Sequence, residues 1–331
     1  MAPRLLGMAI LLAVLFWILW SAFFQRPHLD FNFVASPIRP ERYPVKNTLH
    51  LPRRAPARIP KIQHQPVEEK PVTRAMRLSR LAEVRNAFLH AWNGYKREAW
   101  GRDELKPVEG GSQKTFCGWA ATLVDSLDTL LIMELYDEFE LALEELQKID
   151  FTNTEGCQIN LFETTIRHLG GLLAAFDLSG HTQYLLIEKA IEVAEVLFTA
   201  FDTPNRMPAP HYVWSATEDQ SNHLPSGNVV LAVLGTLSLE FTRLSQITGN
   251  DKYYDGIQRV INELEKWQSE TSLPGLWPAM VDSTLMNESG ALGSGATGGQ
   301  GELYTLGALA DSAYEYLPKV CSPYFVLYFP H

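Results

Sequence analysis

The stretch that decides the fold is Ile159-Asn-Leu-Phe-Glu-Thr-Thr-Ile-Arg-His-Leu-Gly-Gly-Leu-Leu-Ala-Ala-Phe176. Its apolar residues recur at three- and four-residue spacing, which predicts a helix over about 159–178 with one apolar stripe: Phe162, Ile166, Leu169, Leu173 and Phe176. Glu163 lies beside that stripe, and Arg167 and Gly170 follow on the same face at successive turns. The adjacent glycines, each costing about 1 kcal/mol relative to alanine, indicate that something packs closely against this helix.

Glu163 has two interpretations. A glutamate and an arginine four residues apart commonly form an ion pair on a solvated helix face. A glutamate beside a core-facing stripe is costly unless it is paired or functional, which favours a role in a site. The helix alone does not separate the two, so the rest of the chain has to.

Composition excludes several classes of protein. The chain has 331 residues and is 46% hydrophobic, enough for one large domain or two ordinary ones. Residues 26–80 hold 12 Lys and Arg against 4 Asp and Glu, whereas residues 81–331 hold 15 against 34. A folded part this acidic is a poor ligand for polyanions, so nucleic acid is not expected as a partner.

Three cysteines are present, at positions 117, 157 and 321. No CxxC pair or Cys/His cluster occurs in the sequence, so structural zinc is not expected. At most one disulfide can form within the chain, and the sequence leaves its pairing open.

The first 75 residues are not typical of a globular domain. After a short tail (1–4), residues 5–24 form an uncharged apolar run long enough to cross a bilayer. We expect an uncleaved membrane anchor rather than a cleaved signal peptide, because the run is long and no A-x-A site follows. Positive charges do not settle its orientation. Residues 25–75 contain nine prolines and predict an extended, largely disordered stem.

From about residue 76 the pattern predicts helices joined by short turns, with no strand of useful length. The predicted helices cover 80–100, 119–136, 137–149, 159–178, 184–200, 231–248, 253–267 and 302–317. Residues 178–184 and 247–253 each place a glycine just after a helix and a tyrosine four residues later, which indicates two αα-hairpins. Repeated αα-hairpins stack into a solenoid or close into an (α/α) ring, where inner helices can turn polar residues toward a cavity.

Further acids lie within apolar helical segments. Asp311 and the pair Asp125 and Asp128 repeat the pattern of Glu163, which suggests a carboxylate-lined pocket. Glycoside hydrolysis uses a carboxylic acid and a carboxylate across one sugar bond. The alternative is a set of helix-surface acids. Residues 293–298 match G-x-G-x-x-G, but no strand precedes them, so a dinucleotide site is not expected.

Six ordered segments resemble glycoside hydrolase family 47, the class I α-1,2-mannosidases. Phe162-Glu-Thr-Thr-Ile-Arg-His-Leu-Gly-Gly-Leu-Leu173 resembles the family's first catalytic motif, and Ala310-Asp-Ser-Ala-Tyr-Glu-Tyr-Leu317 its second. Four more segments agree in order and spacing: 93–95, 100–107, 124–129 and 239–245. The resemblance covers about residues 78–320.

This resemblance implies an all-α (α/α)7 barrel, a bound calcium, and inverting removal of α-1,2-linked mannose from N-glycans. It implies that Glu163 is the general acid, that Arg167 contributes to the sugar site, and that Asp311 is a second catalytic carboxylate acting as base or as electrostatic support. The expected partners are mannose-rich N-glycans on glycoproteins and, through residues 5–24, a membrane.

The sequence also departs from the family. A further catalytic glutamate and the calcium-ligating threonine, both expected well beyond the second motif, are not in this sequence, so no residue of this chain is assigned as a metal ligand. We therefore expect residues 76–320 to be about the first half of the barrel, residues 321–331 to be unrelated to it, and the truncated chain to be inactive. Some relatives carry an acid where Val233 stands.

Two functions follow from these observations. The first is an α-1,2-mannosidase that trims N-glycans in the ER or Golgi, held there as a single-pass type II membrane protein with the catalytic part in the lumen. The second is a lectin-like protein that binds mannose-rich glycoproteins without cutting them. The Asn287-Glu-Ser289 sequon is meaningful only for a lumenal domain.

Overall fold

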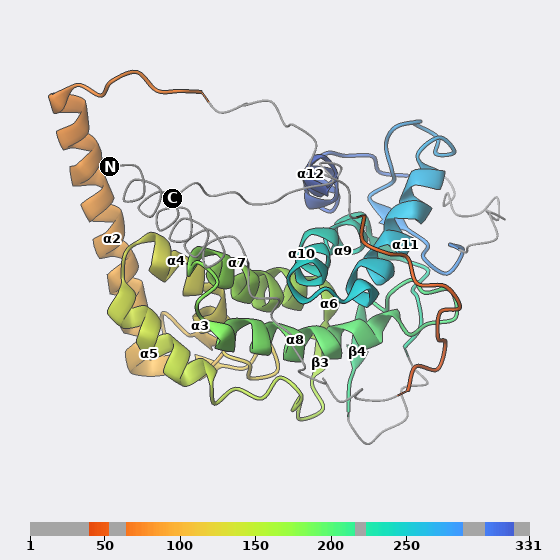
Figure 1. Ribbon diagram of the computed structural model, residues 1–331, viewed down its shortest axis with the longest axis horizontal. Helices are drawn as coiled ribbons and strands as arrows, with labels where there is room; N and C mark the ends of the chain where they lie inside the picture. The colour runs from red at the N-terminus through yellow and green to blue at the C-terminus, as the bar shows by residue number, and fades with distance from the viewer. Residues whose placement is uncertain (1–39, 53–63, 216–222, 287–301, 321–331) are drawn as a thin grey trace, which may run out of the picture. The chain divides into compact units, whose positions relative to one another are not determined.

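The computed structural model describes residues 40–52, 64–215, 223–286 and 302–320. This part of the chain is mostly helical, in agreement with the predicted all-α class (Figure 1). The helices are α2 (Pro71–Ala99), α3 (Ala121–Asp125), α4 (Leu127–Ile132), α5 (Tyr136–Leu146), α6 (Leu161–Thr164), α7 (Gly170–Leu178), α8 (Tyr184–Phe198), α9 (Leu231–Gly235), α10 (Ser238–Thr248), α11 (Asp251–Trp267) and α12 (Asp311–Val320). A π-helical turn (Thr165–Leu169) joins α6 to α7, and a 3-10 turn (Thr199–Phe201) follows α8.

Three pairs of very short antiparallel strands accompany the helices. They are β1 (Glu104–Leu105) with β2 (Ser112–Gln113), β3 (Gln158–Asn160) with β4 (His211–Val213), and β5 (Val229–Val230) with β6 (Met280–Val281). Strands of two or three residues are too short to show an alternating pattern, which is why the sequence did not predict them. The β3–β4 pair fixes the chain directly before α6, because Ile159 lies opposite Tyr212 and both are buried.

Helix α2 begins earlier than the sequence pattern predicted. Pro71 occupies its first turn, where proline has no hydrogen bond to lose and its fixed φ suits a helix. The sequence predicts an apolar stripe along this helix made of Leu81, Val84, Phe88, Trp92 and Tyr95, and of these only Trp92 and Tyr95 are buried. The Trp92 indole N–H (2.8 Å) and the Lys96 ammonium (2.7 Å) both donate to the Glu138 carboxylate, which holds this end of α2 on α5.

Helix α7 is the centre of the core, with α4 and α8 packed against it (Figure 1). Gly171 explains the pair of glycines in the sequence, because a Cβ there would lie 2.7 Å from the backbone oxygen of Val124. The predicted close approach to this helix is confirmed, and the neighbour is the backbone of α3.

The predicted helix over 119–136 is wrong, because α3 and α4 are separate. The break falls at Ser126, whose hydroxyl donates to the backbone oxygen of Thr122 at 2.6 Å and so competes with the helical ladder. The next helix, α5, begins at Tyr136, one residue before its predicted start.

Both predicted αα-hairpin turns are confirmed. Gly180 and Gly249 take φ values of +66° and +71°, the left-handed conformation expected just past a helix end. The turns differ in detail, because His181 is also left-handed, with φ +64°. Its ring lies 2.9 Å from the carboxylate of Asp177, the last turn of α7.

Two other predicted helices are shorter than expected. The helix predicted over 231–248 is divided into α9 and α10, and the helix predicted over 302–317 begins only at Asp311. Residues 302–310 instead bond to other segments: the Ala279 N–H donates to the oxygen of Leu303 (2.8 Å), and the Ala232 N–H to that of Leu309 (2.9 Å). These hydrogen bonds to distant segments occupy carbonyl oxygens that a helix over 302–310 would need for its own backbone bonds, so the helix does not extend over these residues.

Part of the segment predicted to be a disordered stem is bound to the domain. The backbone N–H groups of Arg42 and Tyr43 donate to Asp202, each at 2.7 Å, and that of Leu49 donates to Asp255 at 2.7 Å. The guanidinium of Arg206 donates to the oxygen of Tyr43 at 2.9 Å. Residues 40–52 therefore belong to the folded part, because acidic side chains of the domain capture their backbone.

Cys117 and Cys157 form a disulfide, which resolves the pairing that the sequence left open. Within the described ranges no helix is long and apolar enough to cross a membrane. Several predictions fall outside those ranges: the anchor at 5–24, the sequon at Asn287, the glycine-rich loop at 293–298, and residues 321–331 with Cys321.

Candidate active site

Glu163 stands at the start of a helix whose position is set locally. Asn160 ends strand β3 and accepts a hydrogen bond from the Glu163 backbone N–H at 3.0 Å, which is an N-cap. The helix dipole favours a negative charge at this end. The Glu163 side chain is partly exposed, so a ligand can reach it.

Arg167 connects Glu163 to another segment. Its Nε donates to Glu163 Oε2 at 2.7 Å, so the expected i,i+4 ion pair does form. Its Nη1 also donates to Asp125 Oδ2 at 3.3 Å, and its guanidinium lies 5.4 Å from the centre of the Phe116 ring. The arginine thus joins two carboxylates from segments about forty residues apart, which an isolated surface pair does not do.

A π-helical turn lies between Glu163 and α7, in the segment that carries Arg167. Residues 165–169 are wound with five-residue hydrogen bonding, which rotates the side chains after Glu163 relative to a regular helix. Such turns are rare in proteins as a whole, and those that do occur are often found at functional sites. Burial raises the pKa of Asp125, and the carboxylates of Asp128 and Glu163 add to this, although Arg167 opposes them. Of the four acids that the sequence pattern grouped, Asp125 therefore lies in the site with Glu163, and Asp128 lies near Asp125.

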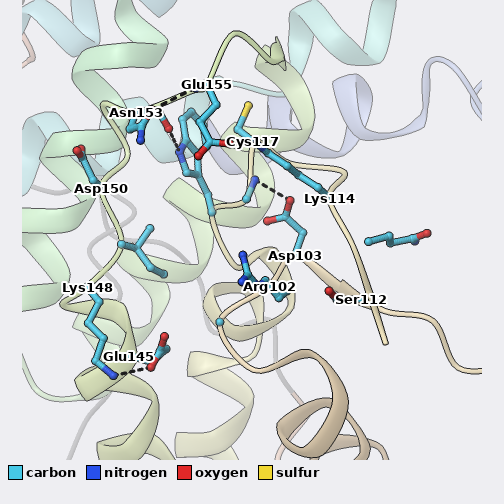
Figure 2. Close-up of a pocket in the computed structure, with 15 residues that line it drawn as sticks. Arg102, Asp103, Ser112, Lys114, Cys117, Glu145, Lys148, Asp150, Asn153 and Glu155 are labelled. Atoms are coloured by element: carbon cyan, nitrogen blue, oxygen red, sulfur yellow. Dashed lines mark hydrogen bonds and ion pairs between the residues drawn. The ribbon is translucent and has the colours of Figure 1, made fainter. Parts of the chain in front are cut away.

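Asp103 fixes the loop that carries Phe116. Its carboxylate is fully buried and accepts backbone N–H groups from Thr115 (3.1 Å), Phe116 (2.8 Å) and Gly118 (2.8 Å). Figure 2 shows Asp103 pointing at this loop, beside Lys114 and the disulfide cysteine Cys117. Asp103 lies within the segment 100–107 that resembles the family, but its spacing alone predicts no role for it.

The same loop lines a cavity of about 520 Å³ (Figure 2). Its wall is rich in charged groups, several of which are paired with one another, such as Lys114 with Glu155 (2.5 Å) and Lys148 with Glu145 (2.7 Å). Neither Glu163 nor Arg167 lines it. The cavity is therefore a neighbour of the candidate active site rather than its centre.

His168, the residue after Arg167, lies among aromatic side chains. The rings of Phe116, Trp119 and Phe151 surround it at centroid distances of 5.9 to 6.0 Å. It is fully buried, and neither ring nitrogen makes a hydrogen bond of normal geometry within the described part of the chain. Burial lowers its pKa to about 4, so the imidazole is neutral at physiological pH.

Asp311 is placed differently. It occupies the first turn of α12, is exposed, and accepts a hydrogen bond from the Ser312 backbone N–H at 2.9 Å. Among the described residues it shares no bonded partner with Glu163 or Arg167. Its helix is held by others: the Thr236 hydroxyl donates to that of Ser312 at 2.8 Å.

Glu240 lies between α12 and the start of α7, and the sequence pattern did not identify it as a site residue. On α10, its Oε1 accepts from the Tyr316 hydroxyl of α12 at 2.7 Å. A methyl group on Gly170, at the start of α7, would lie 3.7 Å from its Cγ. Some of the side chain is exposed, but Oε2 is fully covered and has no partner among the described residues. Burial raises the pKa of Glu240 to about 7 despite the Tyr316 bond.

The available signal for Glu240 was the same as for Glu163, an acid between apolar neighbours, here Leu239 and Phe241. Residues 239–245 contribute to the family resemblance, but no role for Glu240 was predicted from them. The expected departure at Val233 lies on α9, in the same group of helices that holds α12.

A calcium site is not found in the described part of the chain. No group of three or more His, Cys, Asp or Glu side chains there could hold a metal ion. Between Glu163 and Asp125, the guanidinium of Arg167 already supplies the positive charge. These residues therefore do not fit a calcium ion, and no step below uses one.

The comparisons with known proteins agree with the resemblance. The profile of glycosyl hydrolase family 47 matches residues 87–323. The chain belongs to this family. It is 40% identical over 246 residues to a mannosyl-oligosaccharide 1,2-alpha-mannosidase of Arabidopsis thaliana, covering 73% of this chain and 40% of that protein.

Two further members bear this out. The endoplasmic reticulum mannosyl-oligosaccharide 1,2-alpha-mannosidase of Rattus norvegicus is 38% identical, over 71% of this chain and 33% of that protein. The solved alpha-1,2-mannosidase from Trichoderma reesei is 33% identical, with a TM-score of 0.63 over 73% of this chain and 50% of that one. The family 47 chain thus spans half or less of the length of these relatives.

Proposed function

We propose that this chain carries the general-acid part of an inverting α-1,2-mannosidase, with mannose-rich N-glycans as substrate. The observation that carries the proposal is the Glu163–Arg167–Asp125 cluster at a capped helix start. It is partly exposed, and its motif matches the family. The relatives' printed names support the substrate, since they are mannosyl-oligosaccharide mannosidases.

In this mechanism Glu163 delivers a proton to the glycosidic oxygen as the bond to the mannose C1 breaks. A water molecule attacks C1 from the opposite face, and a carboxylate takes its proton or stabilises the developing positive charge. Asp311 is our candidate for that second carboxylate. An inverting enzyme needs room for this water, so the two carboxylates need not touch.

Arg167 has a positioning role in the same proposal. While it donates to Glu163 and Asp125, it holds both carboxylates in place. A sugar hydroxyl is uncharged and can both donate and accept hydrogen bonds. It can therefore accept from Arg167 in place of one carboxylate, or donate to a carboxylate in place of Arg167, without changing the net charge of the site. The barrel closed by seven hairpins, and calcium, remain family expectations that belong to the whole enzyme.

We propose a lumenal location in the ER or Golgi, with residues 5–24 as a type II anchor. The Cys117–Cys157 disulfide supports an oxidising compartment, because cytosolic proteins rarely keep such bonds. Expression in microsomes tests this: protease protection and a glycan on Asn287 are expected. Cleavage by added protease together with an unmodified Asn287 would contradict it.

Because the truncated chain is expected to be inactive, the activity is tested on a version of the protein extended to the length of its relatives, with an α-1,2-linked mannose disaccharide and proton NMR. Release of β-mannose as the first product is expected, and Glu163→Gln should abolish it, because the amide cannot deliver an acidic proton. General acid catalysis contributes on the order of 10²–10⁴-fold. Binding of the disaccharide without release, equal in both proteins, would favour the lectin-like alternative.

A further inference from the structure

A cavity of about 520 Å³ lies beside the candidate active site and has no part in the mechanism above (Figure 2). Its walls come from residues 101–155, so a single continuous part of the described chain forms it. Sites for small molecules commonly have volumes of about 300–1,000 Å³. The cavity is therefore large enough to hold a small ligand or one unit of a larger one.

One loop, residues 115–119, lies between this cavity and the Glu163 site. The ring of Phe116 lies 5.4 Å from the Arg167 guanidinium, whereas residues 117–119, which follow it directly, line the cavity. Two other wall residues come shortly before β3, the strand that ends at the N-cap of Glu163. A branched ligand with one end at Glu163 therefore has the cavity directly beside it.

Two exposed side chains of the cavity wall, Arg102 and Asn153, have hydrogen-bond donors without an acceptor among the described residues. Asn153 uses its Oδ1 to accept the Glu155 backbone N–H at 3.2 Å, which leaves its NH2 group to donate to a ligand. The pKa of Glu155 is lowered, mainly by the bond from Lys114 and to a smaller extent by the charge of Arg102. Arg102 and the 153–155 turn therefore face the same space, although they come from segments far apart in the sequence.

The charged groups that line the cavity balance one another. Those that solvent reaches are three positive and three negative: Arg102, Lys114, Lys148, Glu145, Asp150 and Glu155. Four of them form the two ion pairs given above, and such exposed pairs contribute little stability, so their groups can exchange partners with a ligand. A wall without net charge favours neither anions nor cations, and its many donors and acceptors do not suit an apolar ligand. This chemistry fits an uncharged ligand with several hydroxyl groups.

We propose that the cavity binds a mannose residue from a second branch of the N-glycan while the branch to be cut lies at Glu163. This inference rests on the proposed function, which supplies a branched, uncharged and hydroxyl-rich substrate. Arg102 and Asn153 donate to hydroxyl oxygens of the bound mannose, and the Glu155 carboxylate accepts from a hydroxyl group. None of these side chains touches the bond that breaks, so they select the substrate and do not act on it.

The first test is binding of a branched mannose-rich oligosaccharide to the full chain, measured by isothermal titration calorimetry. Arg102→Ala combined with Asn153→Ala should weaken binding about tenfold or more, because hydrogen bonds from both side chains are lost. Ser112→Trp, on strand β2 in the cavity wall, should weaken it similarly by filling the cavity. The matched control is Arg97→Ala, at an exposed arginine of α2 that does not line the cavity, which should leave binding unchanged. Circular dichroism verifies that each variant is folded.

The second test uses the version of the protein extended to the length of its relatives. There the double variant of Arg102 and Asn153 should raise KM for the branched substrate about tenfold and change kcat little, because the cavity binds substrate without contacting the reacting bond. KM for the linear α-1,2-linked mannose disaccharide should rise much less, since this substrate has no second branch. The difference between the two substrates separates a binding role from general damage to the fold.

Four results would overturn the proposal. They are the absence of oligosaccharide binding by the folded chain, equal binding by the unchanged chain and both wall variants, an equal rise in KM for the two substrates, and displacement of the oligosaccharide by inorganic phosphate, which would show an anion site. Failure of the proposed function gives a different result: the extended version would not hydrolyse the disaccharide, while the wall variants would still weaken oligosaccharide binding. Conversely, hydrolysis that depends on Glu163, together with wall variants that bind and react as the unchanged protein does, would remove only the second-branch site.

Discussion

The segment around Glu163 is fixed largely by its own neighbours in the sequence, whereas Asp311 is held by helices from elsewhere in the chain. Glu163 has a cap three residues before it and an arginine four residues after it. Asp311 has one local hydrogen bond, and its helix depends on Thr236 of the α9–α10 break and on Glu240 of α10. Glu163, the proposed general acid, is therefore preorganised by local bonds, whereas the position of Asp311, the proposed second carboxylate, depends on long-range packing.

The largest expected effect concerns the disulfide on the Glu163 side. Cys117 and Cys157 are 40 residues apart, and a bond closing such a loop contributes about 4 kcal/mol in the chain-entropy model. Replacing both by alanine should lower the free energy of unfolding by about that amount, measured in urea. The α12 side should still form at low denaturant, seen as unchanged fluorescence of Trp277. If the structure around Glu163 and the structure around α12 were lost at the same urea concentration, the two regions would not differ in how they are held.

The glycine pair gives a closely matched test. Gly171→Ala places a Cβ 2.7 Å from the Val124 oxygen, which forces backbone movement and should cost about 3 kcal/mol. Gly170→Ala meets its nearest atom at 3.5 Å, which is ordinary contact, and should be neutral or stabilising by up to about 1 kcal/mol. Thermal melts compare the two variants. Similar melting temperatures for both would mean that α3 does not pack closely on α7.

His168 makes the Glu163 side sensitive to acid. In the unfolded chain a histidine titrates near pH 6.5, whereas burial lowers the pKa of His168 to about 4. Between these values the unfolded chain binds more protons, so the free energy of unfolding should fall as pH falls from 6.5 to 4. The loss should reach up to about 3 kcal/mol. His168→Phe should flatten this slope. An unchanged slope in that variant would assign the acid sensitivity elsewhere.

Glu240 should give the opposite and smaller dependence on the Asp311 side. Its pKa is raised from 4.5 to about 7, so the folded chain binds more protons between these values. The free energy of unfolding should therefore fall as pH rises from 4.5 to 7, by about 1 kcal/mol once partial exposure is allowed for. Glu240→Gln, which keeps an oxygen for Tyr316, should abolish this dependence. Tyr316→Phe is the control: if it alone removed the dependence, the hydroxyl rather than the carboxyl would be responsible.

Much of the Glu163 side could be predicted, because its bonds join residues a few positions apart. The helix, the Glu163–Arg167 pair and the close contact at Gly171 follow from periodicity and composition. Of the predicted apolar stripe, however, Phe162 and Ile166 are only half-buried, and the helix begins at Leu161 rather than at Ile159. Asp103 and Glu240 could not be assigned roles in this way. Their partners lie 12 to 76 residues away, and no spacing rule links them.

The errors have the same cause. The helix predicted to begin near Glu302 begins at Asp311, because the backbone of residues 303–309 bonds to Ala279 and Ala232 instead of to itself. Residues 40–52 were expected to be disordered from their prolines and charges. They are bound because Asp202 and Asp255 accept their backbone N–H groups, and those acids lie far along the chain.

By itself, the sequence determined the helical class, the hairpin turns and the family motif, because these depend on hydrogen bonds within one or two helical turns and on glycines that take a left-handed conformation. Only the tertiary structure decided where helices stop, that Arg167 reaches Asp125, and that Glu240 lies between the helices of Glu163 and Asp311. These outcomes depend on competition between local and distant partners for the same backbone and side-chain groups. That competition is settled by packing and burial, which no single segment encodes.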